Sequence, residues 1–137
     1  MRRKINNMKE NTEKMEPFGP HLTLDLSNCN KRKLNDLSFI YNLLYELPDK
    51  IGMTKITQPY VFPYSGLVPE DKGITGFVVI AESHISIHTF EEKGYVFIDL
   101  FSCKNFDVEY AAKYLTDAFE AKKVEKNIIL RGRDFPR

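Results

Sequence analysis

Cysteine is scarce in this sequence: Cys29 and Cys103 are the only two, and they form no CxxC pair. Two thiols are too few for a disulfide scaffold or a four-ligand zinc site, which indicates a reducing compartment with both thiols free. An excess of charge is also absent, because 20 Lys and Arg oppose 19 Asp and Glu. A net charge near +1 offers no broad surface for nucleic acid or an anionic membrane, so we expect a small ligand.

Long apolar runs are missing as well. No stretch approaches the ~18 apolar residues of a membrane span, and the basic start "MRRKINNMKENTEKMEP" lacks the apolar segment of a signal peptide. We therefore expect a cytoplasmic protein with no membrane or nucleic-acid partner. Residues 1–17 are polar and predict a flexible leader. The remaining residues, 18–137, are enough for a single domain, and ten phenylalanines provide for its core.

Hydrophobic periodicity predicts the first strand and the first helix. In "GPHLTLDLSNC", residues 19–29, Leu22, Leu24 and Leu26 alternate with polar residues, as in a half-buried strand. Apolar residues then recur near every 3.6 positions over residues 34–50, which predicts a helix. Asn35 or Asp36 can serve as its N-cap, and Pro48 is expected to end it.

The rest of the chain predicts further strands and one more helix. A short strand pattern over residues 53–58 precedes a loop rich in proline and glycine, residues 63–73, and a buried strand, residues 74–83. Residues 107–122 carry an apolar helical stripe, and residues 124–132 predict a last strand. The pattern indicates a two-layer α+β domain, a mostly antiparallel sheet with two helices on one face. The other face is left for a second copy to bury.

The stretch "AESHISIHTF", residues 81–90, places two histidines, two serines and a glutamate in a strand pattern. The following "EEKG" is typical of a hairpin loop that leads into the strand "YVFIDLF". If Phe90 faces Tyr95 across this hairpin, antiparallel pairing puts Ser83 opposite Ser102. The same register sets Glu82 opposite Cys103, so residues about twenty positions apart become neighbours.

The histidines are harder to place. His88 lies five residues from Ser83, which on a regular strand is roughly 16 Å away and on the opposite face. His84 and His88 would stand ~13 Å apart, too far to share a metal. Ser83 also lacks the flanking glycines of a hydrolase nucleophile elbow. The residues alone leave open a half-solvated strand face without catalytic function, formed by Ser83, His84, Ser86 and His88, with Cys103 as a small buried residue.

Two segments carry a resemblance to a known family. "GPHLTLDLSNC" and "TGFVVIAESHISIHTFEEKGYVFIDLFSCK", with a helix directly after, closely resemble the small prokaryotic S-adenosylmethionine decarboxylases over about residues 19–125. The resemblance implies self-cleavage between Glu82 and Ser83, with a bend near Ser83 that brings it to His88. It implies a pyruvoyl cofactor made from Ser83, which forms a Schiff base with S-adenosylmethionine, and no metal or pyridoxal phosphate. It also implies an αββα homodimer and a role in spermidine synthesis.

The resemblance assigns roles to individual residues. His88 matches the family histidine that transfers protons during self-processing, and Thr75 stands where the family usually has an assisting serine. Cys103 matches the proton donor in decarboxylation. Glu92 matches a glutamate that accepts hydrogen bonds from the ribose hydroxyls, and Phe90 replaces a tryptophan near the substrate.

The loop before residue 74 departs from the family pattern. The family has a phenylalanine there that stacks on adenine, and Tyr60, Phe62 and Tyr64 are all candidates for that ring. A decarboxylase for arginine or ornithine on the same scaffold is one alternative, and a non-processing regulatory homologue is another. The carboxylates that could bind a cationic substrate are Glu70, Asp71, Glu91 and Glu92.

Overall fold

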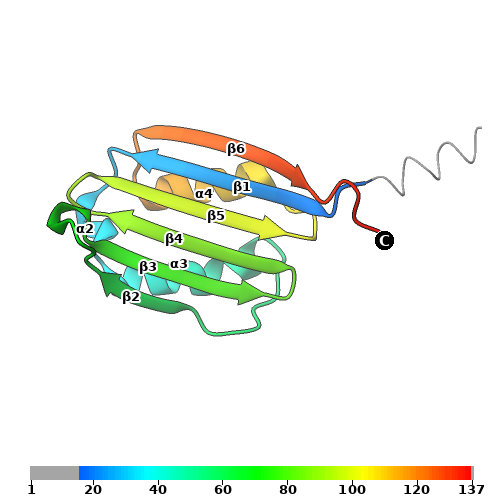
Figure 1. Cartoon of the computed structure of the whole chain (residues 1–137), viewed down its shortest axis with the longest axis horizontal. Helices are drawn as coiled ribbons and strands as arrows, with labels where there is room; N and C mark the ends of the chain where they lie inside the picture. Colours follow the sequence, from blue (N-terminus) through cyan, green and yellow to red (C-terminus); the bar gives the residue numbers. More distant parts are fainter. Residues whose placement is uncertain (1–15, 137) are drawn as a thin grey trace, which may run out of the picture.

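The computed structural model describes residues 16–136, which form a six-stranded antiparallel sheet with helices on one face (Figure 1). The elements are β1 Gly19–Ser27, α2 Lys31–Leu34, α3 Leu37–Lys50, β2 Tyr60–Tyr64, η1 Pro69–Asp71, β3 Gly73–Ile80, β4 Ser83–Phe90, β5 Tyr95–Ser102, α4 Val108–Ala118 and β6 Lys123–Arg131. The strand order is β2-β3-β4-β5-β1-β6. In Figure 1, α3 and α4 both lie behind the sheet, which confirms the predicted two-layer α+β fold.

The core lies between the sheet and the two long helices. Leu22, Leu24 and Leu26 of β1 are fully buried, as their alternation predicted. Ile85 and Ile87 of β4 point to the same layer, and so do Ile98 and Leu100 of β5. The helices complete it with buried side chains from α3 and α4, namely Ile40, Leu43, Leu44, Leu47, Ala111, Ala112 and Leu115. The opposite face of the sheet, hereafter the open face, carries no described helix.

Helix α3 begins and ends for identifiable reasons. The carboxylate of Asp36 accepts a hydrogen bond from the Phe39 amide at 3.0 Å, so Asp36 is the N-cap. The prediction that Pro48 ends the helix is wrong, because α3 continues to Lys50. Proline removes one amide donor but leaves its own carbonyl free, and that carbonyl accepts a hydrogen bond from Ile51. The short helix α2, capped by Asn30, was not predicted.

The strand predicted at residues 53–58 is wrong: β2 runs from Tyr60 to Tyr64 instead. The earlier segment makes only an isolated bridge, between Lys55 and Ile80. Single hydrogen bonds, instead of a continuous strand ladder, join this segment to the end of β3. In one of them the Ala81 amide donates to the Thr54 carbonyl. Pro63 is tolerated in β2 because this is an edge strand of the sheet.

The hairpin of β4 and β5 has the predicted register. Phe90 pairs with Tyr95 and Ser83 with Ser102. Gly94 closes the loop with φ of 66°, a conformation that side chains disfavour. The two strands pair with each other over their whole length, and each has a second neighbour, β3 beside β4 and β1 beside β5. The hairpin therefore occupies the centre of the sheet.

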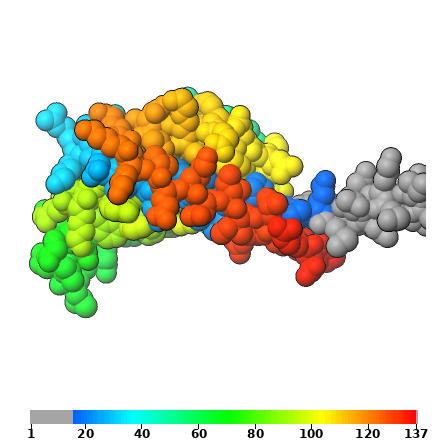
Figure 2. All heavy atoms as spheres, turned by 90° about the horizontal axis from the view of Figure 1, so that it is seen from above, coloured from blue at the N-terminus to red at the C-terminus, as the bar shows by residue number. Residues whose placement is uncertain are grey.

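One loop projects from the sheet. Figure 2 shows the segment between β2 and β3, in green, extending away from α4, in gold. This loop contains η1, and Leu67 at its tip is fully exposed. It therefore forms a raised rim at one end of the open face.

Most of the leader predicted at residues 1–17 lies outside the described residues, so its flexibility stays a prediction. Within residues 16–136, no helix has both the length and the apolar content to cross a membrane.

Thr89 provides a test of how the helices are fixed to the sheet. Its buried hydroxyl donates to the Leu34 carbonyl and accepts from the Ile74 amide, each at 2.8 Å. Thr89→Val leaves both backbone groups without a partner, so we expect the free energy of unfolding to fall by about 3 kcal/mol in urea titrations. Thr89→Ser keeps the hydroxyl and should lose about 1 kcal/mol. Equal losses in the two variants would contradict this account.

Candidate active site

The turn between β3 and β4 holds the bond that the sequence singled out. Ala81 and Glu82 form this turn, and Ser83 is the first residue of β4. The amide of Cys103 donates a hydrogen bond to the Glu82 carbonyl at 2.9 Å. The predicted proximity of Glu82, Ser83 and Cys103 is therefore present, and one of its contacts falls on the carbonyl of the bond between Glu82 and Ser83.

The two thiols have different surroundings. Burial raises the pKa of Cys29 to about 11, so this thiol stays protonated within the core. Cys103 is partly exposed and free, and it lines a cavity of about 320 Å³. The other residues around this cavity come mainly from the start of β1 and the segment before it: Glu16, Pro17, Phe18, Gly19, Pro20, Asn105 and Leu130. Cys103 thus connects this cavity with the turn at Glu82.

Gly19 allows β1 to approach the backbone beside Cys103. A Cβ at this position would lie 1.8 Å from the carbonyl oxygen of Ser102, which is sterically impossible. Sequence analysis missed Phe18 and Gly19 as neighbours of Cys103. The only signal was an aromatic residue and a glycine at the start of a predicted strand, and their proximity to Cys103 depends on pairing between β1 and β5.

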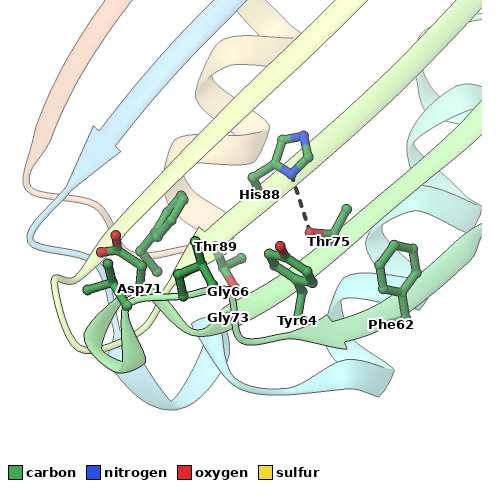
Figure 3. Close-up of a pocket in the computed structure, with 11 residues that line it drawn as sticks. Phe62, Tyr64, Gly66, Asp71, Gly73, Thr75, His88 and Thr89 are labelled. Carbon is green, nitrogen blue, oxygen red and sulfur yellow. Dashed lines mark hydrogen bonds between the residues drawn. The ribbon is translucent and has the colours of Figure 1, made fainter.

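A second cluster lies on the open face at the other end of β4. Thr75 of β3 pairs with His88 of β4, and the Thr75 hydroxyl lies 3.4 Å from the His88 Nδ1 atom (Figure 3). Both residues line a cavity of about 510 Å³. Aromatic and aliphatic side chains form most of its wall: Phe62, Tyr64, Leu67, Val68 and Phe90. The cavity can therefore accept a flat apolar group beside a hydroxyl and an imidazole.

The structure narrows the choice of aromatic ring in the segment that departs from the family pattern. Phe62 and Tyr64 both line the cavity beside His88, and Figure 3 places them on the same strand. Tyr60 instead packs against Phe62 and Phe77, with ring centroids 5.6 and 5.7 Å apart. Tyr60 is thus the weakest of the three candidates.

Glu92 lies in the hairpin loop and does not line this cavity. The Lys72 ammonium is 3.3 Å from the Glu91 carboxylate and 3.9 Å from that of Glu92. A hydrogen bond to Asp71 raises the pKa of Lys93, which forms a second ion pair between the two loops. These ion pairs therefore hold the loop between β2 and β3 against the hairpin loop.

The bend expected near Ser83 is wrong for this chain. Strand β4 keeps a continuous register with β5 from Ser83 to Phe90 and with β3 from Ser83 to His88. Ser83 is level with the buried Ser102, whereas His88 is exposed on the open face. Five residues of strand separate them by roughly 16 Å. Two separate candidate half-sites therefore lie toward opposite ends of β4, one around Ser83 and Cys103 and one around Thr75 and His88.

A polar cluster lies on the open face near the first half-site. His21 Nε2 is 3.0 Å from an Asp99 carboxylate oxygen, and the rings of His21 and His84 both contact Phe101. Arg131 stacks over the same ring at 4.1 Å. Desolvation by burial lowers the pKa of His84; His21 and Arg131 lower it further, while Asp99 opposes them. Among residues 16–136, no group of three potential metal-ligating side chains comes together.

Comparison with known proteins decides the family. The family model described as S-adenosylmethionine decarboxylase matches residues 20–132, which is most of the chain. The chain belongs to the S-adenosylmethionine decarboxylase family.

Family relatives match over most of their own length. The S-adenosylmethionine decarboxylase proenzyme of Thermodesulfovibrio yellowstonii is 39% identical over 111 residues, which cover 79% of this chain and 76% of the relative. That of Bacillus velezensis is 36% identical over 118 residues, covering 86% and 89%. The crystal structure of the adenosylmethionine decarboxylase from Aquifex aeolicus matches with a TM-score of 0.74 at 29% identity, covering 85% and 92%. These names do not favour the arginine, ornithine or regulatory alternatives.

The position of His84 predicts how stability depends on pH. Its pKa is about 6.5 in the unfolded chain and lower in the folded one, so between these values the unfolded state binds more protons. The contribution of the neutral His84 ring to the stability of the fold is therefore complete above pH 6.5. It is lost as the pH falls through the pKa of His84 in the folded state. We expect the melting temperature to decline below pH 6.5, and His84→Gln to flatten this decline. An unchanged slope in the variant would assign the effect to other groups.

Proposed function

We propose that this chain is a self-processing, pyruvoyl-dependent decarboxylase that acts on S-adenosylmethionine and supplies the aminopropyl donor for spermidine synthesis. The proposal depends most on the hydrogen bond from the Cys103 amide to the Glu82 carbonyl, because it joins the bond to be cleaved to the residue expected to act afterwards. Membership of the decarboxylase family supports the reaction. A working thiol requires a reducing compartment, for which we propose the cytoplasm.

Self-processing begins at Ser83. Its hydroxyl oxygen attacks the Glu82 carbonyl carbon, and the negative charge that develops on the oxygen is stabilised by the Cys103 amide, the donor already bound to it. The C–N bond then breaks, leaving an ester and a free amine. Loss of the Ser83 α-proton expels the Glu82 carboxylate, and water replaces the nitrogen, which leaves as ammonia. The products are residues 1–82 and a pyruvoyl-capped chain derived from residues 83–137.

The residues around Ser83 fit such a group. Ser83 begins β4, so the new chain would start at the end of a fixed strand next to Cys103. A pyruvoyl group there would supply an electron sink for the electron pair left on the substrate carbon when carbon dioxide departs. Cys103 holds a proton beside the same position and donates it to the substrate carbon that has lost the carboxylate.

His88 must act from a second chain. It is too far from Ser83 in its own chain, and it lies exposed on the open face, whereas Ser83 is partly exposed at the end of the sheet where β4 begins. We propose that two copies pack open face to open face in an αββα homodimer, related by a two-fold axis. That symmetry would set the half-site with Thr75 and His88 of one copy against Ser83 and Cys103 of the other.

The substrate would lie between the two half-sites. In the wall of the larger cavity, Phe62 or Tyr64 and Phe90 provide aromatic faces for adenine. Glu92 is proposed as the acceptor for the ribose hydroxyls, and it would have to exchange its contact with Lys72 for them.

Two substitutions separate cleavage from turnover. Ser83→Ala should remain one uncut chain by intact mass, since no hydroxyl is left to attack. Cys103→Ala keeps its amide, so it should still split, but carbon dioxide release from carboxyl-labelled S-adenosylmethionine should fall at least about 100-fold. Arginine and ornithine, offered in parallel to the unmodified enzyme, should release none. Full turnover by Cys103→Ala would remove Cys103 as proton donor.

Mixing variants tests the homodimer. Ser83→Ala keeps His88, and His88→Ala keeps Ser83, so neither alone should cleave efficiently. When the two are co-expressed, random pairing gives about half of the His88→Ala chains a partner with an intact histidine. Those chains, recognised by mass, should then be cleaved. If co-expression restores nothing, His88 does not act across an interface.

A further inference from the structure

The segment that follows α3, which overlaps the start of the strand expected at residues 53–58, makes an unusual set of contacts. Residues 52–54, hereafter the bridge segment, follow helix α3 and bind both pieces of chain that meet at the proposed cleavage bond. One piece is the turn between β3 and β4, and the other is the end of β5. The two come from different hairpins, so the bridge segment is a third element that fixes their relative position.

Thr54 binds the turn through both of its backbone polar groups. Its carbonyl accepts from the Ala81 amide at 2.8 Å, and its amide donates to a carboxylate oxygen of Glu82 at 3.1 Å. The side chain of the residue whose carbonyl is to be attacked is therefore anchored. Rotation of the Glu82 peptide unit is restrained from one side by Thr54 and from the other by Cys103.

The end of β5 is bound to the same segment. The Lys104 ammonium donates to the Gly52 carbonyl at 2.9 Å, and the Ser102 hydroxyl lies 3.5 Å from the Met53 sulfur. That hydroxyl also donates to the Lys104 carbonyl and accepts from the Lys104 amide, at 2.8 and 2.9 Å. A closed turn thus forms around Cys103, and it aims the Cys103 amide at Glu82.

We propose that the bridge segment is an alignment device for self-processing, in which Glu82 and Lys104 are positioning residues. Attack on a peptide carbonyl requires the hydroxyl, the carbonyl carbon and the oxyanion donor to be held together, and small displacements cost large factors in rate. Glu82 acts through its carboxylate oxygen as a hydrogen-bond acceptor, not through its charge. Lys104 acts by holding the turn that carries the Cys103 amide. The inference rests on the proposed self-cleavage.

The test measures cleavage rate on full-length precursor made by cell-free synthesis and sampled over time by intact mass. Glu82→Ala removes the acceptor for the Thr54 amide and should slow cleavage roughly 10-fold. Lys104→Ala removes the bond to Gly52 and should slow it about 3-fold. Glu82→Gln and Lys104→Arg keep an acceptor and a donor, so both should cleave at close to the unmodified rate.

A matched control separates alignment from stability. Lys113→Ala breaks an exposed ion pair with Asp117 on α4 that includes no residue of the bridge segment, and it should leave the rate unchanged. Melting temperatures of the Ser83→Ala versions of each variant, which cannot split, should agree within about 2 °C. Unmodified cleavage rates in Glu82→Ala, or equal slowing in Glu82→Gln and Glu82→Ala, would overturn the inference. Absence of cleavage in the unmodified chain would instead overturn the proposed function itself.

Discussion

The register between β4 and β5 is the constraint on which the proposed chemistry depends. It determines that the Cys103 amide meets the carbonyl of Glu82 and not that of a neighbour. A shift of one residue would turn every side chain of β4 to the other face and expose Ile85 and Ile87. The free energy of burying those side chains therefore protects the alignment of the reactive bond. The same hairpin therefore contributes to the stability of the fold and to the position of the reactive bond.

The regular geometry of β4 also keeps Ser83 and His88 apart. A strand that is straight enough to hold Ser83 level with Ser102 cannot also bring His88 to Ser83. One face of the sheet is covered by α3 and α4, while the other carries His84, His88, Phe97 and Phe101 without a described helix over them. The proposed site then needs a second surface. The arrangement favours a site shared between molecules over one built within a single chain.

Much of the fold could be predicted because its cause is local. Leucine alternation in β1, the helical stripe of α4 and the "EEKG" loop each specify an element within a few residues. The hairpin register followed from the loop, and counting outward from that loop was enough to set Cys103 beside Glu82. The bridge segment could not be found in this way. It overlaps the strand-like pattern of residues 53–58 only at Met53 and Thr54, and its backbone groups bind chain ends that are distant in sequence.

The cavity beside His88 was also only partly predictable. Tyr60, Phe62 and Tyr64 were equivalent candidates in the sequence, because this segment departs from the family pattern; in the structure all three belong to β2. What separates them is position along the strand relative to Thr75 and His88, which depends on how β2 pairs with β3. The role of Phe18 and Gly19 beside Cys103 depends in the same way on pairing between β1 and β5.

The strand order has a consequence for a molecule that is cut before Ser83. The first fragment would hold β1, β2 and β3 and the second β4, β5 and β6, so across the sheet the fragments alternate in the order first, second, first, second. Three ladders of hydrogen bonds would then join the separate polypeptides. Neither fragment could dissociate without breaking all three ladders. Once the pieces had come apart, however, reassembly would become a second-order encounter that dilution slows. The cleaved protein would thus stay assembled under native conditions but would refold slowly once its two fragments had separated.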